Sequence, residues 1–317
     1  MTYQHTPVML KEILAYLNPK SGENYIDCTL GGAGYTLEIA KRIGSEGKIL
    51  SIDLDQTAIA NAVEKIQQNK YKNIILANDN FKNLSAIIKK NFANNKTTKF
   101  AGIVFDLGLS SAQLQDQSRG FSFQLVNAPL NMAFGQNTKE SAESIINEYS
   151  ENELTRIFKD YGEEKNAWQI AKQIIKTRRE MPIKTVDQLL VIINKTVDQN
   201  RRALKIHPAT KIFQALRIAV NDELENLKKV LPQAISALAV NGKIAIVAFH
   251  SLEDRIVKQF FKQESRSCVC SPICPACQCN HQAQLQILTP KVIKPTEKEI
   301  LDNPRSRSAK LRIAKKI

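Results

Sequence analysis

The strongest chemical signal in the sequence is a glycine-rich turn near the amino terminus. Asp27 ends a short apolar run, and Gly31, Gly32 and Gly34 follow it before a helical pattern begins. Glycines let a ligand approach the backbone closely, and the free N–H groups at the start of a helix bind polar ligand atoms. Asp53 ends the next apolar run, where a carboxylate can accept hydrogen bonds from both hydroxyls of an adenosine ribose. This region therefore predicts a site for an adenosine-containing cofactor.

The position of the glycines indicates which cofactor is bound. A dinucleotide fingerprint needs a third glycine where Leu37 stands, because the helix must come close behind a pyrophosphate. S-adenosylmethionine carries no phosphate, and a carboxylate such as that of Asp27 can pair with its ammonium group. The turn thus favours S-adenosylmethionine, with a dinucleotide, or a tight turn that holds no ligand, as the alternatives.

The elements that must position these residues alternate between short apolar runs and helical patterns. We predict strands over residues 24–28, 48–53, 73–77 and 101–106, and helices over residues 35–43, 57–67 and 84–91. This alternation predicts a parallel sheet with helices on both faces, a doubly wound Rossmann-like α/β fold. Ligands of such folds bind beyond the carboxyl ends of the strands. We therefore expect Asp27, Asp53 and Asp106, which all end strands, to lie on one rim.

The alternation stops in the middle of the chain. Only helical patterns occur from about residue 142 to 195, with Trp168, Ile170, Ile174 and Ile175 on one apolar stripe. Strand character returns at residues 243–249, after a turn at Asn241-Gly242. A long helix over 209–230 precedes it, with core-facing Phe213, Leu216, Val220, Leu224 and Leu227. We predict a discontinuous S-adenosylmethionine-binding domain, residues 1–115 and 210–317, and an inserted all-helical domain, residues 116–209, that recognises the substrate.

The charge of the chain favours a polyanionic partner. The 45 Lys and Arg residues exceed the 31 Asp and Glu residues, which gives a net charge of +14. Two stretches, residues 201–221 and 304–317, contain no acid. The basic residues of the first are Arg201, Arg202, Lys205, Lys211 and Arg217, and those of the second are Arg305, Arg307, Lys310, Arg312, Lys315 and Lys316. We predict phosphate contacts there. The alternatives are a basic surface without a partner and, for residues 310–314, an edge strand with exposed cations.

The chain shows no sign of export or membrane insertion. Its amino terminus lacks the charged flank and apolar run of a secretory signal, and no apolar stretch reaches the ~18 residues of a membrane span. We expect a cytoplasmic protein that has no membrane partner.

A cluster of cysteines near the carboxyl terminus offers metal ligands. The cluster comprises Cys268, Cys270, Cys274, Cys277 and Cys279, with His281 beyond it. These are more thiolates than a tetrahedral zinc ion needs, and their spacing is irregular. Zinc binding, a loop of reduced thiols without a ligand, and a redox role are the three interpretations.

Taken end to end, the sequence resembles one known family. The motifs that carry the resemblance are His5-Thr-Pro-Val-Met-Leu10, Asp106-Leu-Gly-Leu-Ser-Ser-Ala-Gln113, Arg119-Gly-Phe-Ser-Phe123, Gly162-Glu-Glu164, His207-Pro-Ala-Thr210, Phe213 to Asn221, Phe249-His-Ser-Leu-Glu-Asp-Arg255 and Asn303 to Arg312. They are similar to those of the bacterial 16S ribosomal RNA (cytosine-N4)-methyltransferases of the MraW/RsmH type. The resemblance implies a class I methyltransferase sheet and transfer of a methyl group to a decoding-centre cytidine of 16S RNA. It also implies the small ribosomal subunit as partner, and not DNA.

The resemblance also implies the cofactor contacts. Together with Gly32 of the turn, they are Ala33, Gly34, Tyr35, Asp53, Phe81, Asp106 and Gln113. The family has a glycine and a histidine where Ala33 and Tyr35 stand, so we expect these contacts to be made through the backbone. It has an aspartate and an arginine where Asn131 and Ala133 stand, which changes the local substrate contacts.

The residue that handles the target amine is not fixed by a motif. An Asp/Asn-Pro-Pro-aromatic motif, typical of amine methylation, is missing after the fourth strand, so the target atom rests on the resemblance. Asp106 and His250 are the candidate catalytic residues. Asp106 can instead face the cofactor, the role that we favour, and the segment from His250 can instead cap a helix. Phe121 and Phe123 can stack on a flipped base or belong to the core.

Three functions from different classes therefore remain. The first is an rRNA methyltransferase, which the motifs favour. The second is a nicotinamide-dependent oxidoreductase that uses the same turn, and the third is a non-catalytic RNA-binding protein that has kept the fold.

Overall fold

The computed structural model describes residues 7–93, 98–125, 127–135, 138, 140–197, 208–270 and 277–317. The chain divides into two compact units. The first contains the residues up to Gly108 and from Leu224 onward, and the second is formed by Leu109–Glu223. Within the described residues, no helix combines the length and apolar character that crossing a membrane would need.

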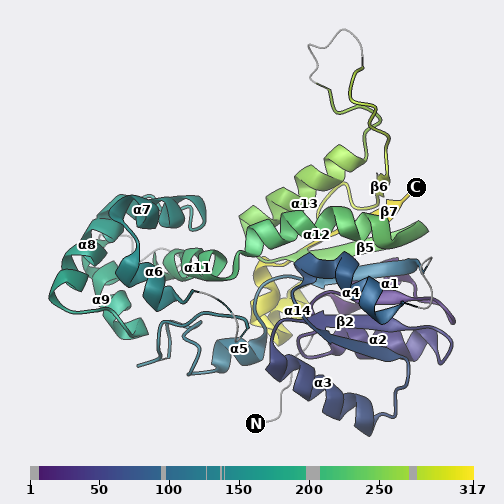
Figure 1. Ribbon diagram of the computed structural model, residues 1–317, viewed down its shortest axis with the longest axis horizontal. Helices are drawn as coiled ribbons and strands as arrows, with labels where there is room; N and C mark the ends of the chain where they lie inside the picture. Colours follow the sequence, from purple (N-terminus) through teal and green to yellow (C-terminus); the bar gives the residue numbers. More distant parts are fainter. Residues whose placement is uncertain are drawn as a thin grey trace. The chain divides into compact units, whose positions relative to one another are not determined.

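The first unit is built on a seven-stranded sheet (Figure 1). Its strands are β1 (Tyr25–Asp27), β2 (Ile49–Asp53), β3 (Ile74–Asn78), β4 (Phe100–Asp106), β5 (Leu238–Ala248), β6 (Leu285–Ile287) and β7 (Lys310–Lys316). The spatial order is β3-β2-β1-β4-β5-β7-β6. Strands β1 to β5 are parallel, whereas β7 is antiparallel to both β5 and β6. The order reverses between β1 and β4, which is where ligands bind in doubly wound folds.

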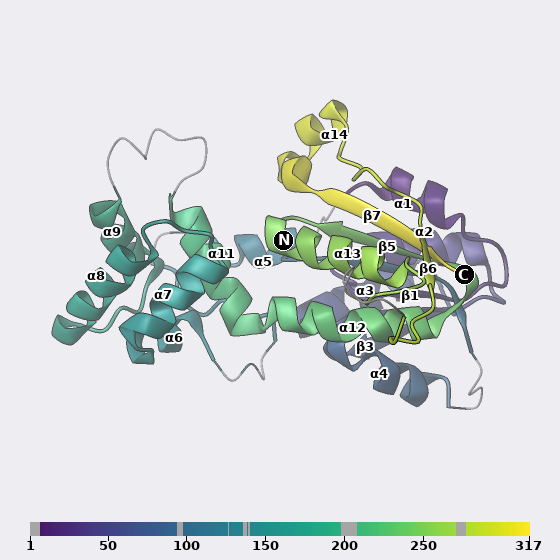
Figure 2. The same ribbon diagram turned by 90° about the horizontal axis from the view of Figure 1, so that it is seen from above.

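Helices cover both faces of this sheet. Both faces need cover because successive apolar side chains along each strand point to opposite faces. Ile26 and Ile103 face a core shared with α4 (Leu84–Asn91), α12 (Glu223–Ala237) and α13 (Ser251–Glu264). Tyr25 and Val104, their neighbours in the chain, face a second core shared with α1 (Leu10–Leu17) and α2 (Gly34–Ile43). Figure 2 shows the sheet between these helices. The remaining helices of this unit are α3 (Gln56–Gln68), η1 (Phe81–Asn83), α14 (Glu297–Asp302) and η2 (Pro304–Ser308). The predicted doubly wound fold is confirmed.

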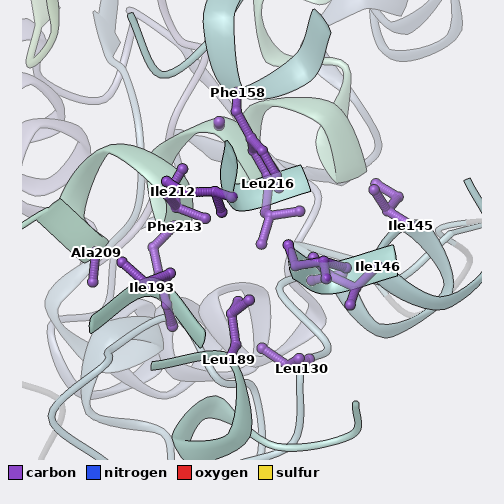
Figure 3. Packing of buried hydrophobic residues seen from close by; sticks show 14 of the residues in the cluster. Leu130, Ile145, Ile146, Phe158, Leu189, Ile193, Ala209, Ile212, Phe213 and Leu216 are labelled. Carbon is purple, nitrogen blue, oxygen red and sulfur yellow. The ribbon is translucent and has the colours of Figure 1, made fainter. Parts of the chain in front are cut away.

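The described part of the second unit is helical. It contains α5 (Ser111–Gln115), α6 (Ala142–Glu148), α7 (Glu151–Asp160), α8 (Ala167–Glu180), α9 (Val186–Thr196) and α11 (Pro208–Asn221). Their apolar sides enclose a separate core, in which Ile146, Phe158, Leu189 and Leu216 are fully buried (Figure 3). The unit therefore has the core that an independently folding domain requires.

Two predictions about the connection between the units were wrong. The helix expected over 209–230 is interrupted at Asp222, where φ is +51°, so it forms α11 and α12. Its apolar stripe is correspondingly divided, with Phe213 in the core of the second unit and Leu227 in that of the first. The chain passes from one unit to the other at Gly108/Leu109 and at Glu223/Leu224, whereas the sequence analysis predicted the domain boundaries after residues 115 and 209.

Three local predictions also need correction. Asn241 and Gly242 do not form a turn but lie within β5, next to a register shift against β4, and Asn241 has a φ of +66°. Strand β7 is not an edge strand, because β5 and β6 pair with its two sides. Trp168 is not in the core: it is 49 % exposed, and its indole N–H donates a hydrogen bond to Glu151.

Candidate cofactor site at the carboxyl ends of the strands

The first acid of the rim supports the glycine turn from inside. Asp27 ends β1 and is fully buried. Its Oδ1 accepts a hydrogen bond from the Thr29 backbone N–H at 3.1 Å, and its Oδ2 accepts one from the Thr36 hydroxyl at 2.7 Å. The Thr36 hydroxyl also lies 2.8 Å from that of Ser51 in β2. Asp27 therefore fixes the turn to the sheet, and the direct contact with a cofactor ammonium group expected from the sequence is not supported.

The second acid, Asp53, joins the turn to the end of β2. Its Oδ2 accepts a hydrogen bond from the Gly31 backbone N–H, and its Oδ1 accepts one from the Asp55 backbone N–H, both at 2.8 Å. Each carboxylate oxygen has two lone pairs, so both oxygens retain the capacity to accept a ligand hydroxyl. Asp53 is half-buried, unlike Asp27. Its position is suited to a ribose.

The backbone conformation of the turn depends on its small residues. Gly31 has a φ of +46°. Ala33 has a φ of +65° at the N-cap of α2, a conformation that costs a residue with a Cβ about 1 kcal/mol or more. A Cβ on Gly34 would lie 2.7 Å from the side chain of Pro7, so only glycine fits there. Tyr35 points into the core, where its hydroxyl donates a hydrogen bond to the Val8 carbonyl. Its side chain is thus committed to structure, and only its backbone is open to a cofactor role.

Burial makes this rim costly for negative charge. It raises the pKa of the Asp27 carboxyl to about 7, opposed by the hydrogen bonds from Thr36 and Thr29 and assisted by the nearby Asp106 and Asp53. Burial also raises the pKa of Asp53 to about 6, against the stabilising hydrogen bonds from Asp55 and Gly31. A ligand that brings a positive charge or hydroxyl donors would relieve this cost. S-adenosylmethionine brings both, through its sulfonium and ammonium groups and its ribose.

Phe81 and Asp106 complete the described part of the rim. The backbone N–H of Asp106, which ends β4, donates a hydrogen bond to the Thr29 hydroxyl at 2.7 Å. The half-buried Phe81 ring packs edge-on against Phe105, with 5.9 Å between ring centroids. The loop before Phe81 is attached to β2, because the Asp79 N–H donates to the Asp53 carbonyl at 3.1 Å. The three acids that were expected on one rim, Asp27, Asp53 and Asp106, therefore lie near one another, and the loop that carries Phe81 is attached beside them.

His250, the other candidate catalytic residue, follows β5 on the same side of the sheet. It is the N-cap residue of α13, the position that the capping interpretation had given to Ser251. The Oε2 atom of Glu253 accepts hydrogen bonds from the backbone N–H groups of Phe249 (2.9 Å) and His250 (3.3 Å). The His250 Nε2 atom lies 3.2 Å from the Glu253 Oε1 atom. The imidazole is thus held against the helix start.

An ion cluster that the sequence did not reveal anchors the same helix. The Asp254 Oδ1 atom lies 2.6 Å from Arg312 Nε, and its Oδ2 atom lies 3.5 Å from Lys310 Nζ, both cations belonging to β7. Despite the opposing effect of burial, the hydrogen bond and charge of Arg312, together with Lys310, hold the pKa of Asp254 below its usual value. Two cations expected to contact phosphate therefore have a structural partner.

Other basic residues of the predicted phosphate-binding stretches also have partners inside their unit. Arg217 makes a bidentate pair with Glu223 at 2.8 and 3.0 Å. Lys211 donates to the Glu163 carbonyl at 2.9 Å, and Lys316 donates to the carbonyls of Ile235 and Leu238. Arg305 and Arg307 of η2 are exposed. Arg201, Arg202, Lys205 and His207 lie outside the described residues.

The aromatic pair of the second unit belongs to its core. Phe121 is buried and stacks on Phe134 with 5.5 Å between centroids, and Phe123 meets Phe213 edge-on at 5.7 Å. Stacking of these rings on a flipped base is therefore not supported.

Gln113 lies in α5, where its Oε1 accepts the Ser110 N–H at 2.9 Å in a capping box.

A hollow of about 300 Å³ in the second unit coincides with the departures from the family motif. Its lining includes Arg119, Asn131, Ala133, Glu140 and Ser141. The Asn131 Oδ1 atom accepts the Ala133 N–H at 3.0 Å, so the loop closes on itself without the family's aspartate.

Comparison with known proteins gives this site its context. A model of the MraW methylase family matches residues 2–317. The chain belongs to this family. It is therefore a methyltransferase, and its cofactor is S-adenosylmethionine. The resemblance identified from the motifs is confirmed.

Relatives of similar length support the same assignment. A protein of Halothermothrix orenii is 45 % identical over 314 residues, which are 99 % of each chain, and one of Clostridium botulinum (strain Loch Maree) is 43 % identical over 317 residues, all of both chains. Both are named ribosomal RNA small subunit methyltransferase H. A solved rRNA methylase of Streptococcus thermophilus has 9 % identity and a TM-score of 0.43, covering 96 % of this chain and 95 % of that one. The family assignment therefore rests on sequence.

Proposed function

We propose that this methyltransferase modifies the exocyclic N4 of a decoding-centre cytidine in 16S ribosomal RNA, acting on the small ribosomal subunit in the cytoplasm. The observation that carries the proposal is the full-length match to a family whose curated members are named for the RNA of the small subunit. The rim of Asp53, Phe81 and Asp106 at the reversal of strand order supports it, since that is where the cofactor must lie.

We assign the cofactor contacts to the rim and the turn. The backbone of Gly32, Ala33, Gly34 and Tyr35 would take the amino-acid part of S-adenosylmethionine. Asp53 would accept hydrogen bonds from the ribose hydroxyls, and Phe81 would pack beside the adenine. Asp106 would lie near the adenine amino group or near the methionine end of the cofactor. Gln113 is assigned through its family motif alone. A dinucleotide is not favoured, because the helix after the turn carries Leu37 where close approach to a pyrophosphate requires glycine.

The main task of the protein in this reaction is to align the target nitrogen, the methyl group and the sulfur. S-adenosylmethionine would supply a methyl group on a sulfonium. In-line attack by the nitrogen would form the N–C bond, break the S–C bond to leave a neutral thioether, and release one N4 proton. Cytosine N4 is a poor nucleophile, since its lone pair is shared with the ring. An acceptor for an N4–H bond would favour the reactive geometry. We retain Asp106 and His250 as candidates, and prefer Asp106 as a cofactor contact.

The second unit is proposed to recognise the substrate. It has its own core, as a recognition domain requires, and a hollow that contains Arg119. On the first unit, Arg305 and Arg307 are exposed cations suited to phosphate. A non-catalytic RNA-binding protein would use the same cations but would have no need of the cofactor rim.

The test is methyl transfer to RNA. The protein is incubated with labelled S-adenosylmethionine and small subunits from a strain that lacks the enzyme, and labelled RNA fragments are mapped. We expect label in one fragment of 16S RNA, and less on naked RNA than on subunits. Label in protein alone, or in the large-subunit RNA used as a control, would contradict the proposal.

A further inference from the structure

Between α13 and β6, residues 265–270 and residues 277–284 form the two limbs of an arm that extends away from the sheet (Figure 1). Residues 265–270 and 277–284 of this arm are described, and none of their side chains is buried. At the base, the Gln284 N–H donates to the Glu264 carbonyl at 2.8 Å. A segment of this size cannot hold itself together by apolar burial, so small folded segments of this kind need a disulfide or a metal.

Four thiols converge across the two limbs of the arm. The sulfur atoms of Cys268, Cys270, Cys277 and Cys279 all lie within 4.8 Å of one another. Cys279 lies 3.7 Å from Cys268 and 3.7 Å from Cys277, measured between sulfur atoms. A disulfide bond is much shorter, about 2.05 Å. Sulfurs bound at ~2.3 Å to a tetrahedral zinc ion lie about 3.8 Å apart. The spacing therefore matches edges of a zinc–thiolate tetrahedron.

Backbone hydrogen bonds hold the sulfurs in these positions. The Val269 N–H donates to the Cys279 sulfur, and the Gln278 N–H donates to the Cys270 sulfur, both at 3.4 Å. Each bond joins one limb to the other. Donors of this kind favour a charged acceptor and orient metal ligands.

We propose that Cys268, Cys270, Cys277 and Cys279 form a structural zinc site that joins the two limbs of the arm. Four protein ligands leave no coordination position for a substrate, so the site is structural rather than catalytic. As the ion binds, each thiol releases its proton to solvent and forms one S–Zn bond, and no oxidant or reductant is required. Cys274 lies outside the described residues, and the tetrahedral set is complete without it.

The site is separate from the methyl-transfer chemistry. Helix α13 begins beside His250 at the rim and ends at Glu264 at the base of the arm. Its 14 residues span on the order of 20 Å. Loss of zinc should therefore loosen the arm without removing a cofactor contact.

The test begins with the metal content of the purified full-length protein. We expect about one zinc ion per chain by plasma mass spectrometry. Replacement by Co²⁺ should give the charge-transfer and intense visible bands of a tetrahedral tetrathiolate. Cys270→Ser and Cys277→Ser should each weaken zinc binding at least tenfold in competition with a chelator. Two controls, Gln278→Ala, which keeps the donating backbone, and Cys274→Ser, should retain the wild-type affinity.

Each variant is also tested for S-adenosylhomocysteine binding, which reports an intact first unit and should change less than twofold. A metal-free wild-type protein that has two disulfides in the arm by mass spectrometry would overturn the proposal. So would stoichiometric iron in place of zinc, a cobalt spectrum without thiolate bands, or loss of zinc in Cys274→Ser equal to that in Cys270→Ser.

Discussion

The backbone N–H of Gly31 donates a hydrogen bond of 2.8 Å to Oδ2 of Asp53, tying the glycine turn after β1 to the acid that ends β2. The same carboxylate receives the Asp55 N–H at 2.8 Å. One side chain thus sets the shape of the turn and is also the proposed acceptor for the ribose hydroxyls.

Asp53→Ala should weaken binding of S-adenosylhomocysteine about 10- to 100-fold, because hydrogen bonds to a charged acceptor contribute about 1.5–3 kcal/mol. RNA affinity should stay within twofold. Isothermal calorimetry and filter binding measure the two quantities, and Asp302→Ala, an exposed acid of α14, is the control. Equal loss of both affinities would contradict the assignment of Asp53.

The buried Asp27 should make the ligand-free protein less stable as pH rises. The pKa of its carboxyl is raised from 3.8 to about 7, so between these values the folded state binds more protons than the unfolded state. Stability therefore falls from about pH 4 to pH 7. Asp27→Asn can keep bonds to Thr29 and Thr36 without the charge. Urea denaturation should show a smaller loss of stability for this variant between pH 5 and 7, and parallel curves for the two proteins would argue against the shift.

Asp254→Asn should lower the free energy of unfolding by about 1–3 kcal/mol, because it weakens a pair in which Asp254 and Arg312 are only 15 % and 12 % exposed. The pKa of Asp254 is lowered on folding, so its contribution is present above its unfolded pKa and is lost as pH falls. The exposed pair of Lys228 and Glu225, with both side chains 55 % exposed, is the matched control. Glu225→Gln should change stability by less than about 0.5 kcal/mol. Equal effects of the two substitutions would show that burial does not distinguish these pairs.

Arg305→Ala combined with Arg307→Ala should weaken RNA binding and make it less sensitive to salt. Each lost phosphate contact reduces the slope of log affinity against log salt by about 1. The slope is measured by filter binding from low to moderate salt. Lys228→Ala removes another exposed cation and should leave the slope unchanged. An unaltered slope in the double variant would remove η2 from the proposed RNA surface.

The cofactor half of the fold could be predicted from sequence because its signals are local. Each of β1, β2 and β4 is an apolar run that ends in an acid, and the glycines after Asp27 specify the turn. The break between α11 and α12 could not be predicted in this way. The apolar spacing continues across Asp222, and only its positive φ ends the helix. The sequence also could not distinguish a turn from a β-irregularity at Asn241-Gly242. These residue types are typical of turns, but here they lie within β5 beside a register shift against β4.

The site was predicted less completely than the fold. The pattern of strands predicted that Asp53 and Asp106 lie on one rim. Residue type alone could not show that the Asp27 carboxylate is hydrogen-bonded to Thr29 and Thr36. The basic stretches illustrate the same difficulty. Arg217 and Arg312 resemble phosphate ligands in the sequence, and only their distances to Glu223 and Asp254 reveal structural pairs. Contacts between distant residues are set by the fold rather than by spacing.

The most direct test of the proposed function is the identity of the methylated nucleoside. Small subunits labelled by the wild-type protein and by Asp53→Ala are digested completely, and the nucleosides are separated and compared with standards. We predict that the label appears as N4-methylcytidine with the wild-type protein and is reduced at least tenfold with the variant at limiting S-adenosylmethionine. Label in 5-methylcytidine or any other nucleoside would contradict the proposed target atom.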